Sequence, residues 1–568
     1  MRRLMRYLFI LFVIAVAGGF IVRRLLRAPV IKPGSYLLLE VGGSYSEGPP
    51  PDLVASLLRR RERTLNELIT TIREAQIDQR IKGVIVKVTP LEIGWGKIQD
   101  IRDALLEFKG SHKPLLALLQ AEASGSNKEY YLASTADRVY LSPSVTAPLN
   151  GLAANFIFLG GVWEKLDIQM DVEKIREYKT FGDMLANKEM TPAHRDMANS
   201  LLDSLNAQFI GGIMRNRGLT ADAVRALIDK CPVSPTDYET AHLSDGSRYL
   251  QDLHDEIGGE QTPLVDMKDY EQVDAASLGL GVGPKIGVVY AVGGIMTGES
   301  GTGIQGEMMG SDTVSHALMD AADDDAVRAI VFRVDSPGGS ALASDLVWRA
   351  TQQARKKKPV IVSMSDVAAS GGYYVSAGGS RILAQPGTLT GSIGVVFARA
   401  NIKGLLARLG INTETITRGP FANLEDVTTP LTPDGRQKLI MEMDHIYDIF
   451  VDRVAAGRSL TAERVNAIGR GRVWTGAQAK ENGLVDELGG FAAATQAAKK
   501  AAGIDPKQEV ELVYYPRRKS VLERLSEALG SGKSTDLPAA WQQVLRAAAV
   551  PFEDGSLLTL MPQAVDVR

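Results

Sequence analysis

Two short stretches decide the fold of this chain: IKGVIVKV at residues 81–88 and VRAIVFRV at residues 327–334. Both are rich in valine and isoleucine, which is typical of strands buried inside a sheet. Each is followed by a second run that predicts a strand, KPLLALLQ at 113–120 and KPVIVSMS at 358–365. One strand pattern therefore occurs twice in the chain.

Further matches extend this repeat along both halves of the sequence. They are Tyr130-Tyr131 with Tyr373-Tyr374, RVYLSPSVT (138–146) with RILAQPGTL (381–389), and RGLTADAVRALI (217–228) with RSLTAERVNAIG (458–469). The offset between the matched segments stays between 241 and 246 residues. A drift that small is hard to obtain by chance, so we infer two copies of one domain.

Each copy alternates strand patterns with helical patterns such as IQDIRDALLEF (98–108) and ASDLVWRATQQARKK (343–357). This alternation predicts βαβ units, mainly parallel strand pairing and an α/β fold. The expected segments are an N-terminal anchor at 1–30, a first copy at 31–280, a second copy at 281–495 and a C-terminal tail at 496–568, in which EVELVYY (509–515) reads as a strand.

The first 30 residues, MRRLMRYLFILFVIAVAGGFIVRRLLRAPV, predict a membrane anchor. The uncharged run from Tyr7 to Val22 is slightly shorter than the roughly 20 apolar residues of a spanning helix, but the flanking arginines can snorkel. A cleaved signal peptide is the alternative, since Ala15-Val16-Ala17 has the small-x-small pattern. We favour an uncleaved anchor because the apolar run continues past that site. The arginines are balanced on the two sides and do not fix the orientation.

Composition excludes several functional classes. With 568 residues the chain is longer than one core usually covers. A net charge of -3 argues against general binding to nucleic acid. The one cysteine, Cys231, can form neither an intrachain disulfide nor a CxxC site. We expect no metal and no cofactor.

Comparing the two copies isolates the chemistry, because the second copy carries three features that the first lacks. With the Tyr-Tyr pairs as register, Ser370 of SGGYY falls on Asn127, and Ser392 of TGSIG falls on Leu149. The segment DSPGGS (335–340) has no counterpart in the first copy. All three lie at predicted strand ends or helix starts, where open α/β sheets place their sites.

These features suit a nucleophile with an oxyanion hole. Ser370 precedes two glycines at the start of a predicted helix, where N–H groups favour negative charge. Gly338 and Gly339 form a strand-to-helix turn, and their N–H groups together with that of Gly371 can hold an oxyanion. Losing one such donor typically costs about 3–4 kcal/mol of transition-state stabilisation. Either motif alone reads as a tight turn, but both together in one copy favour a site.

The residues alone do not identify the general base that would take the proton of Ser370. None of the histidines lies in a glycine-rich or strand-end motif; they are His112, His194, His242, His254, His316 and His445. His194 and His445 fall in helical patterns and read as surface residues. A histidine base stays open, and lysine is the known alternative. Lys179, in KIREYKTFGDML of the first copy, aligns with Arg418-Gly419 of the second. From the residues alone it is one lysine among many.

The chain resembles the long form of the bacterial signal peptide peptidase A family, also called protease IV, in the Clp-protease/crotonase-like superfamily. The resemblance covers nearly the whole sequence and rests on the anchor, the tandem copies, DSPGGS, DVAASGGYYVSAGG and TGSIG. It implies two tandem Clp-protease/crotonase-like domains and a Ser-Lys dyad. Ser370 matches the family's nucleophile, Lys179 its general base, and Ser392 the serine that orients the lysine.

The same resemblance implies a membrane-anchored serine endopeptidase that degrades cleaved signal peptides and other apolar peptides. The implied partners are those peptides, membrane lipid and further copies in a bowl-shaped homotetramer. The implied location is the bacterial cytoplasmic membrane, crossed once, with the catalytic body on the outer, periplasmic face.

Three rival interpretations stay open. GTGIQG (301–306) fits a dinucleotide-binding fingerprint, but eight residues separate it from the predicted strand at 286–292, which favours a loop near the site. An acyl-CoA enzyme of the crotonase type would share the fold but needs no serine nucleophile or anchor. A non-catalytic membrane scaffold is the third alternative.

Overall fold

The computed structural model describes residues 30–48, 63–121, 126–303, 306–517, 558–560 and 566–567. The apolar run of the predicted anchor, residues 7–22, lies outside these ranges. Within them, no helix has both the length and the apolar character needed to cross a membrane. The described chain is a mixed α/β structure, as the alternating pattern predicts.

The first half of the chain builds a parallel sheet with the strand order β4-β3-β2-β1-β7. Its strands are β1 (Ser35–Gly43), β2 (Ile81–Leu91), β3 (Leu115–Leu119), β4 (Arg138–Leu141) and β7 (Leu264–Asp266). Helices α3 (Leu65–Ile77) and α4 (Trp95–Lys109) cover one face, and α11 (Leu250–Glu256) packs on the other. The predicted strand at 81–88 is thus the central β2.

The second half builds a sheet with the order β18-β16-β14-β12-β8-β20. Its strands are β8 (Lys285–Val292), β12 (Val327–Ser336), β14 (Val360–Ala369), β16 (Leu389–Gly391), β18 (Val473–Thr475) and β20 (Glu511–Tyr515); β15 (Arg381–Ala384) also pairs with β14 and with β19 (Glu487–Leu488). All of these pairs are parallel except β16 with β18. The strand predicted in the tail is therefore β20, at the edge of this sheet.

Burial on both faces explains the apolar runs of this second sheet. On β12, Ile330, Phe332 and Val334 face the core under α13 (Ser311–Asp323) and α14 (Ala341–Lys357). Ala329 and Val331 face the opposite core, which α20 (Phe491–Ala501) covers. Successive side chains of a strand alternate between faces, so a doubly covered strand must be apolar throughout.

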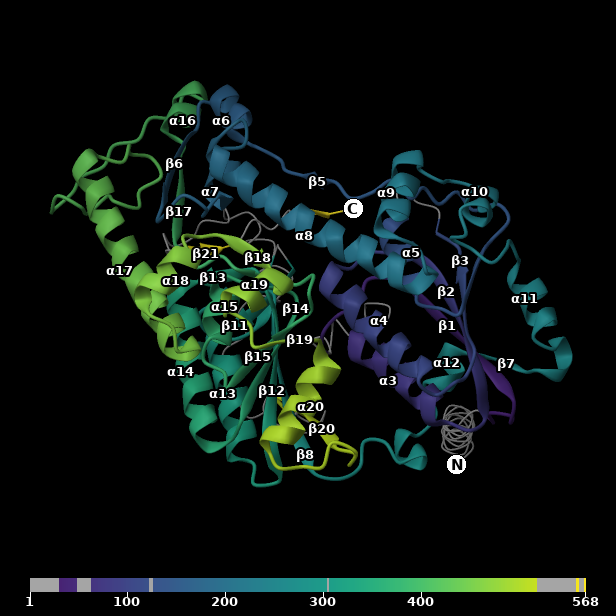
Figure 1. Cartoon of the computed structure of the whole chain (residues 1–568). Coiled ribbons are helices and arrows are strands. Elements are labelled where there is room, and N and C mark those ends of the chain that lie inside the picture. Colours follow the sequence, from purple (N-terminus) through teal and green to yellow (C-terminus); the bar gives the residue numbers. More distant parts are fainter. Residues whose placement is uncertain are drawn as a thin grey trace, which may run out of the picture.

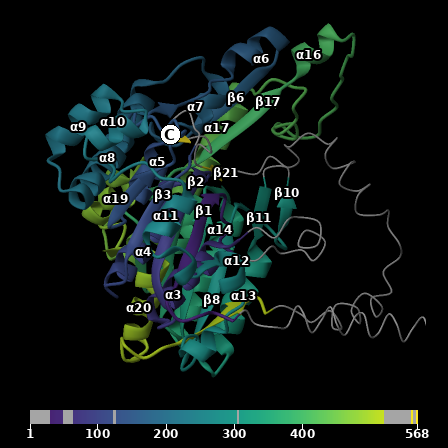
Figure 2. The same ribbon diagram turned by 90° about the vertical axis from the view of Figure 1, so that its right-hand side faces the viewer.

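A third sheet joins the halves in the order β10-β11-β9-β13-β21-β17-β6. Its strands are β6 (Gln169–Lys174), β9 (Gly294–Met296), β10 (Gly301–Gly303), β11 (Gly306–Gly310), β13 (Gly338–Ser340), β17 (Val396–Asn401) and β21 (Leu558–Leu560). The first-half strand β6 pairs antiparallel with β17 of the second half, from Lys174 opposite Val396 to Gln169 opposite Asn401. Figure 2 shows these two strands running together toward α6 (Gly160–Leu166) and α16 (Lys403–Arg408).

The described residues of the motif at 301–306 lie in two paired strands, β10 and β11. β10 and β11 pair antiparallel, and α13 begins only at Ser311. A dinucleotide fingerprint needs a strand that turns directly into a helix. These paired strands lack that geometry.

The longest helices are α8 (Pro192–Arg217) and α17 (Pro433–Arg458), one from each half. Both begin after a threonine whose hydroxyl caps the first turn, with proline as the first helical residue, which has no N–H to leave unsatisfied. Figure 1 shows α8 lying across the molecule between the two halves.

The remaining described elements are α5 (Asn127–Ala133), α7 (Phe181–Ala186), α9 (Ala221–Lys230), α10 (Pro235–Thr240), α12 (Met267–Tyr270), α15 (Gly371–Ser376), α18 (Ala462–Ile468), α19 (Gly476–Asn482), η1 (Gly259–Gln261), η2 (Ala275–Leu278), β5 (Ala154–Asn155) and β22 (Asp566–Val567).

A buried cluster of charges lies between the halves. Arg333 of β12 is fully buried and donates hydrogen bonds to Glu47 and Asp100, both at 2.8 Å. Lys97 of α4 donates to Asp335, the first residue of DSPGGS, at 2.8 Å. Glu47, Lys97 and Asp100 come from the first half, so the cluster ties that half to the segment that carries the glycine turn.

One carboxylate of this cluster also caps a helix of the other half. Helix α4 begins after Gly94, which has no side chain to cap it. Asp366 accepts hydrogen bonds from the N–H groups of Gly94 at 2.9 Å and of Lys97 at 2.8 Å. A carboxylate suits a helix N-terminus because of the free N–H groups and the dipole there.

Candidate active site

Ser370 lies on a sharp turn between β14 and α15. Its φ of 55° is uncommon for a residue with a side chain, and such strain typically costs about 1–3 kcal/mol. The turn is held at both ends, because the Ser370 N–H donates to the carbonyl of Gly391 at 2.8 Å and the Ser370 carbonyl accepts from Tyr374 at 2.9 Å. The side chain is buried.

The turn is tight because Gly372 lets another segment approach. A Cβ at Gly372 would lie 2.5 Å from the carbonyl oxygen of Ser336. No real Cβ tolerates that distance, so the second glycine of SGG is needed for packing against DSPGGS. The two motifs that the sequence singled out are therefore in direct contact.

Lys179 reaches this turn from the other half of the chain. It follows β6 and precedes α7, and its side chain is buried. The backbone before it docks on the second half: the Ile175 N–H donates to the carbonyl of Val395 at 2.9 Å, and the Tyr178 N–H to that of Arg470 at 3.1 Å. These backbone hydrogen bonds continue the β6–β17 pairing and place Lys179 beside Ser370.

The structure brings Lys179, Ser370 and Ser392 together. The Lys179 Nζ lies at hydrogen-bonding distance from three oxygens: 2.7 Å from the Ser370 Oγ, 3.0 Å from the Ser392 Oγ and 2.9 Å from the Ser392 carbonyl oxygen. Burial lowers the pKa of Lys179 well below its ordinary value of 10.5. An amine with a lowered pKa beside a serine hydroxyl can accept that hydroxyl's proton.

The N–H groups of the predicted oxyanion glycines differ in their environments. The Gly338 N–H donates to the Ser336 Oγ at 3.2 Å, and that hydroxyl donates to the Gly293 carbonyl at 2.7 Å. Gly339 lies in β13, where a Cβ would come within 2.2 Å of the Ile295 carbonyl oxygen. Gly371 is the first residue of α15, and a first-turn N–H has no partner inside its own helix.

The expectation that His194 lies on the surface is wrong. It is buried at the start of α8, with its ring centroid 4.7 Å from that of Phe156 and 5.6 Å from that of Phe158. These aromatic residues come from a segment outside the helical pattern, so helix periodicity alone could not reveal the burial. Among the described residues, neither ring nitrogen of His194 has a hydrogen-bond partner. His445 is exposed on α17, as expected.

Gly471 is a residue of the site that the sequence analysis missed. Its φ is 82°, and a Cβ there would lie 2.4 Å from the backbone nitrogen of Lys179. Glycine at this position is what permits the Lys179 backbone to dock. The only signal in the sequence is a glycine in RGRVW between a helical pattern and a strand, which looks like an ordinary turn.

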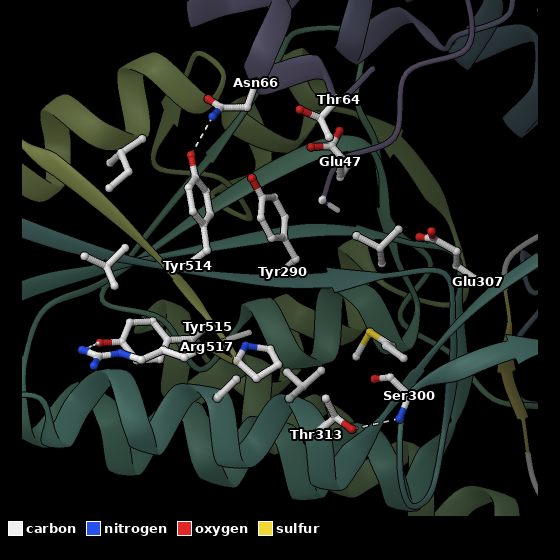
Figure 3. A pocket seen from close by; sticks show the side chains of 18 of the residues that line it. Glu47, Thr64, Asn66, Tyr290, Ser300, Glu307, Thr313, Tyr514, Tyr515 and Arg517 are labelled. Atoms are coloured by element: carbon white, nitrogen blue, oxygen red, sulfur yellow. Dashed lines mark hydrogen bonds between the residues drawn. The ribbon is translucent and has the colours of Figure 1, made fainter. Parts of the chain in front are cut away.

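A cavity of about 750 Å³ lies apart from these three residues. Figure 3 shows its lining, which includes Tyr290 and Tyr514; the Tyr514 hydroxyl accepts a hydrogen bond from Asn66 at 2.7 Å. Its lining includes none of Ser370, Lys179 and Ser392. This cavity is therefore separate from the candidate active site. Within the described ranges, no group of three or more His, Cys, Asp or Glu side chains is arranged to hold a metal ion.

Comparison with known families identifies the family of the chain. The model of peptidase family S49 matches residues 107–257 and 352–505, more than half of the chain. The chain belongs to peptidase family S49. It is accordingly a serine-type peptidase, and the resemblance drawn from its motifs is confirmed.

Two of the relatives of this S49 peptidase match most of its length, and a third matches part of it. The chloroplastic serine protease SPPA of Arabidopsis thaliana is 34% identical over 510 residues, covering 88% of this chain and 74% of the relative. Protease 4 of Salmonella typhi is 31% identical over 514 residues, covering 87% and 81%. A putative signal peptide peptidase SppA of Enterococcus faecium is 39% identical over 173 residues, covering 29% and 49%. Among solved structures, a mutant of ClpP1 from Listeria monocytogenes covers 36% of this chain and 93% of its own at 15% identity, and its TM-score of 0.24 is too low to support an argument.

Proposed function

We propose that this S49 peptidase cleaves peptide bonds with Ser370 as nucleophile and Lys179 as general base. The observation that carries the proposal is the 2.7 Å separation of the Lys179 Nζ from the Ser370 Oγ in a buried site. A buried lysine outside an ion pair favours its neutral form, because desolvation penalises the charge. A scaffold protein would have no need of that costly arrangement.

The three contacts of Lys179 suit a neutral amine. An amine has two N–H donors and one lone pair. The two donors serve the carbonyl and hydroxyl of Ser392, at 2.9 Å and 3.0 Å, which aims the lone pair at Ser370. At the same 2.7 Å separation the Ser370 hydroxyl then donates to Nζ, and Ser392 acts as a positioning residue.

The reaction follows from this arrangement. Lys179 takes the proton of Ser370, and the Oγ attacks the carbonyl carbon of the peptide. N–H groups of Gly371, Gly338 and Gly339 hold the oxyanion, for which the Gly338 N–H must leave the Ser336 hydroxyl. The ammonium of Lys179 then protonates the leaving amine, and water releases the acyl group from Ser370 by the reverse proton path.

We further propose that the substrates are cleaved signal peptides and other apolar peptides at a membrane surface. Support comes from the apolar run at residues 7–22, which would anchor the chain once in the membrane, and from the motifs shared with signal peptide peptidases. The proposed location is a bacterial cytoplasmic membrane with the catalytic body on its outer face. A detached signal peptide is apolar and is released at the membrane, and the anchor would keep the peptidase beside it.

The test of the dyad uses the full-length chain in detergent and an apolar signal peptide as substrate. Ser370→Ala and Lys179→Ala should each lower kcat by at least about 10³-fold with circular dichroism unchanged. Lys188→Ala is the matched control, because Lys188 is exposed and pairs with Glu164 at the surface. If Lys179→Ala keeps its rate, the base is wrong. If the unaltered chain cleaves no peptide, the proposed function fails.

We also propose that copies of the chain assemble head to tail. At the repeat offset of 243, β17 corresponds to residues 153–158 and β6 to residues 412–417. β17 and β6 pair within one chain, whereas residues 412–417 form no strand in the described structure. β5, inside the segment 153–158, pairs with β22 on one edge and leaves its other edge without a partner among the described residues. The missing equivalent of the β6–β17 pair can form between two copies.

Both the segment 412–417 and the segment 153–158 carry an exposed apolar side chain. Ile416 is 86% exposed and Ile157 is 64% exposed. Head-to-tail contacts that close give a ring, and the family resemblance implies a homotetramer. Ile416→Lys should reduce the mass in analytical ultracentrifugation, whereas Ile77→Lys on α3, another exposed isoleucine, should not. An unchanged mass for Ile416→Lys would contradict this pairing.

A further inference from the structure

The aspartate that begins DSPGGS connects the glycine turn to the strand that leads to the nucleophile. One carboxylate oxygen of Asp335 accepts a hydrogen bond from the Val367 N–H at 3.1 Å. Val367 lies in β14, three residues before Ser370. Gly338 and Gly339, two of the proposed oxyanion donors, follow Asp335 by three and four residues. The Asp335 carboxylate therefore links the two segments whose relative position sets the distance from the nucleophile to the oxyanion hole.

Lys97 of the first half holds the other oxygen of this carboxylate. Its Nζ donates a hydrogen bond to Asp335 at 2.8 Å and lies 3.7 Å from carboxylate oxygens of Asp366 and Glu47. Burial raises the pKa of Asp335, and the nearby charge of Lys97 opposes that rise. An ionised carboxylate is the stronger acceptor for the Val367 N–H. Lys97 thus strengthens the link between the glycine turn and β14.

Close backbone packing fixes the place of Lys97. Helix α4 lies against β14 (Figure 1), and a Cβ at Gly96 would come within 2.6 Å of the Ser365 carbonyl oxygen. The Asp366 carboxylate accepts hydrogen bonds from the N–H groups of Gly94 and Lys97. Because these contacts hold the first turn of α4 on β14, the Lys97 side chain starts from a fixed position.

The internal repeat shows where this contact comes from. At the offset of 243, DSPGGS (335–340) falls on EIGWGK (92–97), so that Lys97 falls on Ser340. The first copy lacks the glycine motif here, and the segment in its place contacts the motif of the second copy through Lys97. A task in the site of the second copy accounts for this difference between the copies.

We propose that Lys97 and Asp335 are positioning residues of the oxyanion hole, in which the lysine holds the carboxylate that ties the glycine turn to the strand leading to Ser370. This inference rests on the proposed peptidase function. The pair acts through the backbone of DSPGGS, which the Gly293 N–H also holds by donating to the Asp335 carbonyl at 2.9 Å. A displacement near 1 Å in a catalytic group can lower the rate about 10²-fold, so a small shift of the turn is measurable.

The first test measures kcat and KM of the full-length chain in detergent with an apolar signal peptide. Lys97→Met should lower kcat at least about 10-fold and change KM less than about twofold, because the oxyanion forms only after the substrate is bound. Lys97→Arg keeps the charge and should recover most of the lost rate. Lys109→Met is the matched control, since Lys109 lies on the same helix and pairs with Asp137 of the first half, and its kcat should not change.

A second variant tests the pair without removing a cation from the buried charges. Asp335→Asn preserves the shape of the side chain but not its charge, and it should lower kcat by a similar factor. If Lys97 acts through Asp335, the double variant should lose no more rate than the worse of the two single variants. Losses that multiply would show that the two residues act independently, which would overturn the proposal.

A tetrahedral inhibitor separates positioning from a purely structural role. A peptide boronic acid forms an adduct with a serine Oγ and resembles the transition state, with one oxygen in the place of the oxyanion. Lys97→Met should weaken its binding at least about 10-fold. In chains that carry Ser370→Ala, a fluorescent apolar signal peptide should bind equally with and without Lys97→Met. Weakened binding of both ligands, or of neither, would overturn the positioning role.

The same measurements distinguish this inference from the function on which it rests. If the unaltered chain cleaves the peptide and binds the boronic acid while Lys97→Met does both equally well, only the positioning role fails. If the unaltered chain neither cleaves any peptide nor binds the boronic acid, the proposed function fails and the positioning role fails with it.

Discussion

Two lysines of the first half, Lys97, which is partly buried, and Lys179, which is buried, have opposite environments. Lys97 faces the carboxylates of Asp335 and Asp366, which outweigh burial and raise its pKa. Lys179 faces hydroxyls and a carbonyl, and burial lowers its pKa. The difference assigns them different tasks, because a permanently charged lysine can hold acids together but cannot take a proton from Ser370.

This contrast predicts the pH dependence of the reaction. The value of kcat/KM for an apolar peptide should rise with pH through the pKa of Lys179, since only the neutral amine is a base. Because burial lowers that pKa, the rise should be complete well below pH 10.5. A profile that still rises near pH 10.5 would show that the lysine is not desolvated during catalysis.

Lys179 should also cost stability at neutral pH. Between its lowered folded pKa and 10.5 the unfolded chain binds a proton that the folded chain does not, so stability rises with pH across that window. Lys179→Met removes the penalty and should raise the free energy of unfolding at pH 7 by about 1 kcal/mol. The gain should shrink as the pH approaches 10.5, and Lys188→Met at the surface should show no such gain. A gain independent of pH would argue against a neutral lysine.

At the scale of elements, the proposed catalysis depends on how β6 and the segment after it dock on the second half. The contact is made by backbone, through the β6–β17 pairing and the hydrogen bond from Tyr178 to Arg470. Gly471 sets the closest approach, because no other residue leaves room for the Lys179 backbone. The position of the base is thus fixed by a glycine that lies 292 residues further along the chain.

Gly471→Ala should therefore lower kcat by about 10²-fold, because a shift near 1 Å in a catalytic group has roughly that effect. Gly279→Ala is the matched control: its φ of 78° is close to the 82° of Gly471, but a Cβ there has no neighbour within 4 Å. Both variants carry the same backbone strain of about 1–2 kcal/mol. Equal activity of the two variants would show that the close approach does not matter.

The sequence could predict most of the local structure and little of the contact between the halves. The runs at 81–88 and 327–334 predict strands because burial on both faces requires apolar residues in succession, and both are strands. Ser370 could be found because the first copy lacks it. Lys179 emerged only through the family resemblance. Gly471 and the cap that Asp366 supplies to α4 act on backbone from the other half, and such contacts leave no periodicity to read.

At the scale of the whole molecule, the charge cluster joins the halves with an excess of acid. Among the described residues, the carboxylates of this cluster are Glu47, Asp100, Asp335 and Asp366, and the cations paired with them are Arg333 and Lys97. Arg333 and Lys97 hold the pKa of Glu47 at about 2 against the effect of burial. Burial raises the pKa of Asp100 and of Asp335, although each has a cationic partner. The pKa of Glu47 is lowered while those of Asp100 and Asp335 are raised, because two cations cannot neutralise four carboxylates.

Removing the charge of Arg333 should destabilise the contact between the two halves. Arg333→Met leaves Glu47 and Asp100 buried without their cation, which should lower the free energy of unfolding at pH 7 by about 3–5 kcal/mol. Glu47 stabilises the fold above its ordinary pKa of 4.5, and this contribution is lost as the pH falls through about 2. The variant's acids should protonate at higher pH, so its deficit should shrink at pH 4.

Urea denaturation of both chains at the two pH values measures this effect. Arg248→Met, which breaks an exposed pair with Glu256, is the control and should change stability by less than about 0.5 kcal/mol. A deficit of Arg333→Met that stays the same at both pH values would mean that the lost interactions are not electrostatic.

Lys179 and Ser370 are separated by 191 residues in sequence, so the lysine is synthesised well before the serine. A ribosome releases the first half, with the lysine, long before the serine has been translated. If Lys179 is the base, as proposed, a completed second half stays inactive until β17 pairs with β6 and buries the lysine. The proposed dyad would then give the nascent chain no activity toward its neighbours or itself. Activation by assembly of the halves gives the protection that other proteases obtain from a removable propeptide.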